Sequence, residues 1–190
     1  MSPITHFLSG WAVANMSTMN KRERVLVTLA AVVPDVDGIG ILWDLFLKGG
    51  GVEFYQKFHH SFGHNVFFGI TFACLAFLPG LPKGKIVSLM VLSFHLHLVG
   101  DYVGARGIGE DYWPVTYLWP LTDTGYYWRL QWPLNGWQNV VITGILLVLA
   151  FYWAWWRGYS PIEMVSGQAD NGLVRVLRKR FGEPGGSLNI

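Results

Sequence analysis

Apolar and polar residues follow one another in long blocks, and the apolar blocks predict helices. The longest block without a charged residue is Val140–Trp156, and Arg157 follows it directly. Its length lies at the low end of the roughly 17–25 residues that a membrane-spanning helix needs. A second block, Ile86–Val103, is equally long but contains two histidines and an aspartate. These two blocks predict the helices best suited to crossing a bilayer.

Three shorter blocks complete the pattern. Val66–Leu78 ends at Pro79, Val25–Val33 ends at Pro34, and Thr5–Met16 is amphipathic rather than fully apolar. Several of these blocks are too short to span a bilayer alone, so a helical core in a soluble protein is the competing interpretation. We predict an all-α fold, a multi-pass membrane bundle of about four to five helices.

The C-terminal part of the chain has a different pattern. Between Gly172 and Phe181, apolar residues are interleaved with basic ones. This pattern predicts a C-terminal amphipathic helix on an anionic membrane surface, with an ordinary surface helix as the alternative. We therefore divide the chain into a membrane-embedded domain, residues 1–160, and a basic cytoplasmic tail, residues 161–190.

Composition supports a membrane protein. Charged residues make up 14% of the chain, whereas soluble domains carry about 25%. The 10 Trp, 8 Tyr and 12 Phe residues are typical of proteins that meet both membrane interfaces. A net charge of +2 is too small to indicate nucleic acid as a partner, so the expected partner is the lipid bilayer. Oligomeric state is left open.

Basic residues gather in loops that the helix order places on one side of the membrane. They lie between the first two predicted helices, between the third and fourth, and after the last: Lys21, Arg22, Arg24, Lys83, Lys85, Arg157, Arg175, Arg178, Lys179 and Arg180. Cytoplasmic loops are rich in Lys and Arg, so this side is predicted to face the cytoplasm. The opposite, outer end then holds every histidine apart from His95. We expect a multi-pass protein of the inner (cytoplasmic) membrane.

One pair of polar residues in the apolar block 86–103 has the spacing of a metal site. His97 and Asp101 are four residues apart, which puts both side chains on one face of a helix. Zinc accepts such mixed nitrogen and oxygen ligands, and ionisable groups within an apolar span indicate function. A structural His–Asp hydrogen bond is the alternative. His95 points to the other side of the helix.

Two further motifs add candidate ligands. The run FHHSFGHN holds His59, His60 and His64 just before an apolar block, and a pH-sensitive cluster is the alternative interpretation. The run PDVD places Asp35 and Asp37 in a turn after a helix, where aspartate is often only a cap. His6 stands alone near the N-terminus. Together these residues predict a metal site at one end of the bundle.

Taken in order, these motifs resemble the YdjM-type inner-membrane proteins, a family of membrane-bound metal-dependent hydrolases. The resemblance covers roughly residues 1–125 and rests on Thr5, His6, Pro34, Asp35, Asp37, His59, His64, His97, Asp101, Leu118, Trp119 and Pro120. Two positions depart from the family pattern, because His60 replaces an arginine and Asn65 a serine. These departures concern contacts to substrate rather than the metal ligands.

The motif order is also distantly similar to zinc-dependent phospholipase C and the S1/P1 nucleases. This resemblance implies a main site of Asp35 or Asp37 with His64, His97 and Asp101. His6 and His59 would serve a second metal or support the first, and whichever aspartate is not a ligand would act as general base. The candidate metal ligands are thus His6, Asp37, His59, His64, His97 and Asp101, and the candidate catalytic residues Asp35 and Asp37. A three-zinc cluster is not expected.

The resulting hypothesis is a membrane-bound, metal-dependent hydrolase. Zinc is the expected cofactor, with manganese as the alternative. A phosphoester of the lipid-headgroup type is the expected substrate, cleaved at the outer face of the membrane. The competing hypothesis is a membrane protein without enzymatic activity that carries a structural metal or a lipid-binding site.

Overall fold

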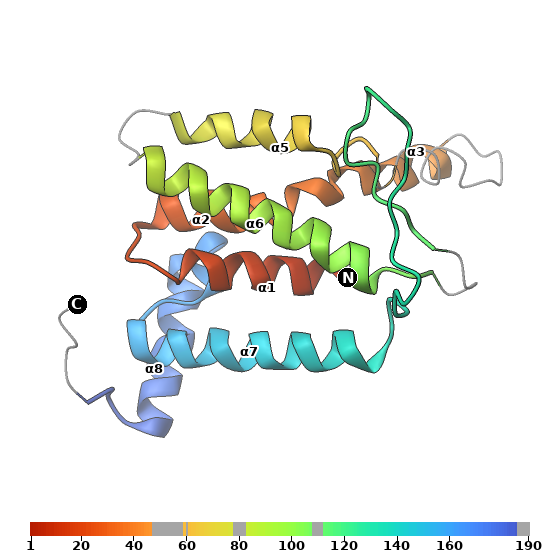
Figure 1. Cartoon of the computed structure of the whole chain (residues 1–190). Coiled ribbons are helices and arrows are strands. Elements are labelled where there is room, and N and C mark those ends of the chain that lie inside the picture. Colours follow the sequence, from red (N-terminus) through yellow and green to blue (C-terminus); the bar gives the residue numbers. More distant parts are fainter. Residues whose placement is uncertain (47–58, 60, 78–82, 108–111, 186–190) are drawn as a thin grey trace.

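The computed structural model describes residues 1–46, 59, 61–77, 83–107 and 112–185, and these residues form helices joined by loops (Figure 1). The elements are α1 (Pro3–Ala14), α2 (Lys21–Ala30), the 3-10 helix η1 (Val33–Ile39), α3 (Gly40–Phe46), α5 (Val66–Ala73), η2 (Cys74–Phe77), α6 (Lys83–Gly104), α7 (Trp137–Arg157), η3 (Pro161–Met164) and α8 (Gly167–Phe181). No strand occurs in the described ranges, beyond two isolated bridges. The predicted all-α fold is confirmed.

Two of the described helices are long and apolar enough to cross a membrane, judged by length and composition. They are Gly84–Gly104 of α6 and the whole of α7, each 21 residues long, which corresponds to about 30 Å. A third candidate is a broken span, in which α2 is followed by Val33–Phe46 at a bend of 57°. Only 17% of the most apolar stretch of α7 is buried, so most of its apolar side chains face outward, as in a helix that contacts lipid.

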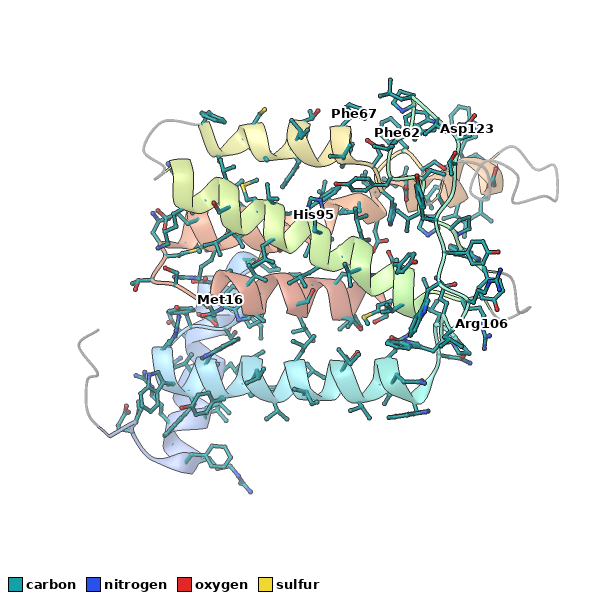
Figure 2. All side chains as sticks on the ribbon, in the orientation of Figure 1. Met16, Phe62, Phe67, His95, Arg106 and Asp123 are labelled. Atoms are coloured by element: carbon teal, nitrogen blue, oxygen red, sulfur yellow. The ribbon has the colours of Figure 1, made fainter. Side chains whose placement is uncertain are left out.

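Helices α1, α5, α6 and α7 run along one common direction, with α1 between α6 and α7 (Figure 1). Figure 2 labels Met16 at one end of this bundle and Arg106 and Asp123 at the other. The first end contains the starts of α2 and α6 and the end of α7. The second end is covered by the loop between α6 and α7. The basic residues Lys21, Arg22, Lys85 and Arg157, at the starts of α2 and α6 and the end of α7, lie at the end opposite this loop, whereas Arg106 lies at the loop end.

Polar caps explain why several helices start earlier than the apolar blocks predict. Ser2 caps α1 through a hydrogen bond from the Thr5 amide. Asn20 and Glu23 form a reciprocal capping box at the start of α2. Such caps satisfy amide groups that lack partners within the helix. The first turns of α1 and α2 are therefore helical although they contribute little to the apolar pattern.

The structure corrects two predictions, one about the C-terminal helix and one about the basic residues. Helix α8 starts at Gly167 and is longer than the predicted segment 172–181. The prediction that Lys21, Arg22 and Arg24 lie in a loop between helices is wrong, because all three belong to the first turn of α2. Arg24 is in addition buried and paired with Glu163 of η3. The division of the chain at residue 160 stays a prediction.

Helices α1 and α2 approach each other closely at Gly10. A Cβ atom at this position would lie 2.7 Å from the carbonyl oxygen of Thr28 and 2.7 Å from the Cβ of Ala31. Small residues commonly allow such close helix contacts in membranes. The contact matters for the site, because α1 carries His6 and Ala31 follows the end of α2.

Substituting Gly10 by alanine is expected to destabilise the protein by about 1–3 kcal/mol, because the new methyl group has no room. Gly144→Ala in α7 is the matched control, since nothing lies within 4 Å of the place that its new methyl group would occupy. That variant should be neutral or more stable by up to about 1 kcal/mol, because alanine favours helix. Thermal unfolding in detergent measures both, and equal stabilities would contradict the close approach.

Candidate metal centre

Four side chains from three parts of the chain converge at the loop-covered end of the bundle. Asp35 comes from η1, His64 from the segment before α5, and His97 and Asp101 from the last turns of α6. One ligand atom from each lies within 4.8 Å of all the others. The two histidines and Asp101 are buried, and Asp35 is partly exposed. This set is the strongest candidate metal centre among the described residues.

The distances within this set fit one small cation. The Nε2 atom of His97 lies 3.0 Å from Nε2 of His64 and 2.9 Å from Oδ2 of Asp101. The Nε2 atom of His64 lies 3.3 Å from Oδ2 of Asp101, and Oδ1 of Asp35 lies 3.6 and 3.8 Å from the two imidazole nitrogens. Ligands of tetrahedral zinc are roughly 3.3–3.6 Å apart, given bonds of about 2.0–2.2 Å. The observed distances lie around this range, and the pairs at 2.9 and 3.0 Å would have to separate by a few tenths of an ångström to bind zinc.

The outer hydrogen bonds of the two histidines direct their Nε2 atoms inward. Nδ1 of His97 donates to the carbonyl oxygen of Ala31 at 2.8 Å, and Nδ1 of His64 donates to Oδ2 of Asp37 at 2.9 Å. These bonds assign the lone pair of each neutral ring to Nε2. With a cation bound, both lone pairs point at it together with the two carboxylates, whereas without one the raised pKa of His64 keeps a proton on its Nε2 atom. Such a group of acceptors is stabilised by a cation between them.

Asp35 adds a second observation. Its Oδ2 atom is buried and has no hydrogen-bond partner within the described part of the chain. A buried carboxylate oxygen without a partner is costly. A cation bound by this carboxylate would remove that cost, so the residues present fit a divalent metal.

The other predicted ligands surround this group instead of joining it. Asp37 accepts hydrogen bonds from Nδ1 of His59 at 2.7 Å, from His64 and from the amide of Gly63 at 3.1 Å. His6 lies on the far side of the group, where its ring stacks on His97 and its Nε2 bonds Oδ1 of Asp101 at 3.0 Å. The terminal amine of Met1 contacts the same oxygen.

The structure thus distinguishes the two aspartates that the sequence left open. Asp35, predicted as a catalytic residue, lies in the four-residue group. Asp37, predicted as ligand or base, holds His64 and His59 in place. His60 lies outside the described residues. His95 is separate from the group and bonds Tyr117.

The electrostatic field at His64 favours positive charge. Burial alone would lower the pKa of this imidazole, but hydrogen bonds to Asp101 and Asp37 and their negative charges raise its pKa to about 9. A metal ion and a proton therefore compete for the same negative surroundings.

A cavity of about 320 Å³ reaches this centre. It is lined on its polar side by Asp35, Asp101 and His59, and on its apolar side by Ile41, Trp113 and Leu134. The ring of Trp113 packs edge-on against His59 with centroids 5.0 Å apart. A small molecule could therefore approach the centre from this side, with His59 held next to it.

Asp37→Asn is expected to weaken zinc binding by about 10- to 100-fold, because the amide no longer fixes His64 as the carboxylate does. Competition with a coloured chelator measures the affinity. His95→Gln is the control, since His95 lies outside the group, and it should bind zinc as the wild type does. Equal affinities of the Asp37→Asn variant and the wild type would show that Asp37 does not orient a ligand.

Comparison with known families identifies the family of the chain. The family model described as YdjM inner membrane protein matches residues 1–168. The chain belongs to the YdjM inner membrane protein family. No curated protein and no solved structure matches the chain. The YdjM match includes every residue of the centre and ends where α8 begins, near Gly167.

Sequence reasoning missed two buried amide side chains that hold the loop between α6 and α7 over the candidate metal centre. Gln131 is buried and donates to the carbonyl oxygen of Asp101 at 2.7 Å. Asn139 donates to the carbonyl oxygen of Gly104 at 2.9 Å and accepts from Trp132 at 2.8 Å. In the sequence, Gln131 and Asn139 are polar residues within a segment rich in tryptophan and apolar residues. This contrast in polarity could have identified them as candidates.

Proposed function

We propose that this protein is a membrane-bound, metal-dependent hydrolase that cleaves a phosphoester of the lipid-headgroup type. One observation carries the proposal: two histidines and two carboxylates lie close enough together to bind one cation, and the two carboxylates, Asp35 and Asp101, line a cavity that His59 also lines. The predicted likeness to zinc-dependent phospholipase C agrees with this chemistry, but it remains an analogy.

In this proposal Asp35, His64, His97 and Asp101 hold the metal. When bound, zinc supplies Lewis acidity toward a phosphoryl oxygen and lowers the pKa of water toward about 7. His59 lines the cavity and is held by Asp37, so it is placed to take a proton from the attacking water. The water oxygen forms a bond to phosphorus, the bond from phosphorus to the leaving alcohol breaks, and the proton passes to that alcohol.

The polarity of the bundle supports an outward-facing site. The basic residues Lys21, Arg22 and Lys85 lie at the end opposite the metal centre. If that end faces the cytoplasm, the centre lies at the outer surface of the inner membrane. Headgroups of the outer leaflet would then be within its reach.

A second candidate function is a structural metal site. Four protein ligands complete a tetrahedron, and closed four-ligand sites are typical of structural zinc. Such a site would fasten η1, the segment before α5 and α6 to one another. The cavity beside Asp35 and His59 favours the hydrolase, because a structural site needs no approach for a substrate.

Hydrolysis of bis(p-nitrophenyl) phosphate by the purified, zinc-loaded protein tests the proposal. We expect turnover that falls about 100- to 10,000-fold in His59→Ala, since this is the typical contribution of general acid–base catalysis. The same variant should keep its zinc, because His59 is not among the four ligands. Ser88→Ala is the control, because Ser88 is exposed on α6 and lines neither the metal centre nor its cavity, and it should retain both. Zinc-loaded protein without turnover would favour the structural role.

A further inference from the structure

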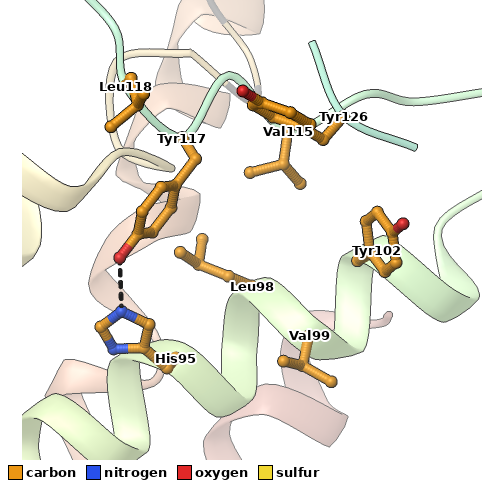
Figure 3. Close-up of a pocket in the computed structure, with 8 residues that line it drawn as sticks. All are labelled: His95, Leu98, Val99, Tyr102, Val115, Tyr117, Leu118 and Tyr126. Atoms are coloured by element: carbon orange, nitrogen blue, oxygen red, sulfur yellow. Dashed lines mark hydrogen bonds between the residues drawn. The ribbon is translucent and has the colours of Figure 1, made fainter. Parts of the chain in front are cut away.

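A second cavity, of about 410 Å³, lies on another side of α6. Figure 3 shows its lining, which comes from α6 and from the loop that crosses the end of the bundle. The helix contributes His95, Leu98, Val99 and Tyr102, and the loop contributes Val115, Tyr117, Leu118 and Tyr126. Its volume falls within the roughly 300–1,000 Å³ of ligand-binding pockets.

Two of the polar side chains in this lining, His95 and Tyr117, are hydrogen-bonded to each other. Nδ1 of His95 donates to the carbonyl oxygen of Val91 at 2.8 Å. Its Nε2 therefore accepts from the hydroxyl of Tyr117, at 3.0 Å (Figure 3). Apart from this pair, the lining consists of four aliphatic residues and the side chains of Tyr102 and Tyr126, so most of it favours an apolar occupant.

The cavity lies on the part of α6 that would contact lipid. Val99 is 56% exposed and Tyr126 is 48% exposed, so the cavity is open at its side. The apolar residues Val91, Leu92 and Leu96 continue the exposed surface along the same candidate span. This surface would face the hydrocarbon of the membrane, and the molecules at hand there are acyl chains.

Residues that are neighbours in the sequence line this cavity and the metal-side cavity, which is the cavity of about 320 Å³ beside Asp35 and His59. In α6, Asp101 lines the metal side while its neighbour Tyr102 lines the apolar side. In the loop, Trp113 lines the metal side and Val115 the apolar side. Val115 is held in place by paired backbone hydrogen bonds with Tyr126. A molecule with a polar head and an apolar chain could thus use both cavities.

We infer that the apolar cavity binds one acyl chain of a membrane lipid whose phosphoester group enters the metal-side cavity. This inference rests on the proposed function, and it narrows the substrate class to phosphoesters that carry a long alkyl or acyl chain. The cavity provides selectivity for the chain, while the metal centre and His59 act on the headgroup.

A matched pair of substrates tests the inference: p-nitrophenyl hexadecyl phosphate and p-nitrophenyl methyl phosphate. The wild type should prefer the hexadecyl ester in kcat/KM. Val99→Trp fills the cavity and should reduce the hexadecyl-to-methyl ratio about tenfold or more, because buried methylene groups lose their contacts. Val148→Trp on the exposed face of α7 is the matched control and should keep the wild-type ratio. Val99→Phe provides a smaller filling residue if the tryptophan variant does not fold.

A binding measurement separates failure of the inference from failure of the hydrolase. Hexadecyl phosphate with a diazirine at the chain end is photolysed with the protein in nanodiscs, and labelled peptides are mapped. We expect label on segments 95–102 and 115–126 that falls at least severalfold in Val99→Trp. Equal ratios in both tryptophan variants, or label that is unchanged by Val99→Trp, would overturn the inference. A wild type that cleaves neither ester but is labelled at these segments would refute only the hydrolase and retain the chain site.

Discussion

Replacing His97 by alanine is expected to reduce bound zinc from one ion per chain to nearly none. His97 contributes its Nε2 atom to the centre and lies within 3.0 Å of ligand atoms from both His64 and Asp101. Its removal leaves three ligands and an uncompensated pair of carboxylates. Elemental analysis of protein purified with zinc and then dialysed against a weak chelator measures the effect.

His95→Ala provides the matched control for His97→Ala. It is the same substitution on the same helix, two residues earlier, and it removes contacts to Tyr117, Val91 and Phe94 that lie outside the centre. Circular dichroism and gel filtration should show that both variants are folded. If His97→Ala retained as much zinc as His95→Ala, or if the wild type bound none, the metal centre would be refuted.

Asp101→Asn extends this prediction to the oxygen ligands. The amide keeps the size of the side chain, so a loss of zinc would report the charge and not the packing. The Oδ1 atom of this carboxylate also accepts hydrogen bonds from Nε2 of His6 and from the terminal amine of Met1. We therefore expect this variant to lose zinc as His97→Ala does, with a larger effect on stability.

The helical pairing of His97 and Asp101 could be predicted from the sequence because it depends on local geometry alone. Two side chains that are four residues apart in a helix lie on one face, and α6 is helical throughout this region. The separate position of His95 follows from the same geometry. The period of the helix was therefore sufficient to predict that two of the four residues in the group, His97 and Asp101, lie together.

The choice between Asp35 and Asp37 could not be predicted in this way. Both lie in the short helix η1, and either carboxylate could turn toward the histidines. Their roles depend on Gly63, whose amide binds Asp37 and which lies so close to Pro34 that a Cβ atom would be 2.0 Å from the Pro34 carbonyl oxygen. This is a contact between segments that are far apart in the sequence, and no pattern in either segment reveals it.

The buried charge of Arg24 was also beyond prediction from pattern. Arg24 stands in a run with Lys21 and Arg22, whose side chains are exposed. Arg24 itself faces η3, a segment near the other end of the sequence, and pairs there with Glu163. Counting basic residues in the sequence does not distinguish an exposed basic side chain from a buried one that is paired with a distant carboxylate.

Glu163→Ala is expected to destabilise the protein by about 3–5 kcal/mol, because it leaves a buried guanidinium without its partner. Nε and Nη2 of Arg24 donate to the two carboxylate oxygens of Glu163 at 2.6 and 2.8 Å. The same guanidinium lies 3.7 Å above the ring of Tyr159. The pair joins α2 to the segment after α7, so its loss should free that segment from the bundle.

Two comparisons make this prediction specific. Glu183→Ala removes an exposed pair with Arg178, whose atoms are 3.6 Å apart, and should cost roughly 0–1 kcal/mol. The double variant Arg24→Met with Glu163→Met should recover much of the stability, because two apolar side chains leave no buried charge. Unfolding in detergent measures all of these. A Glu163→Ala variant as stable as Glu183→Ala would show that this ion pair does not hold the C-terminal segment to the membrane helices.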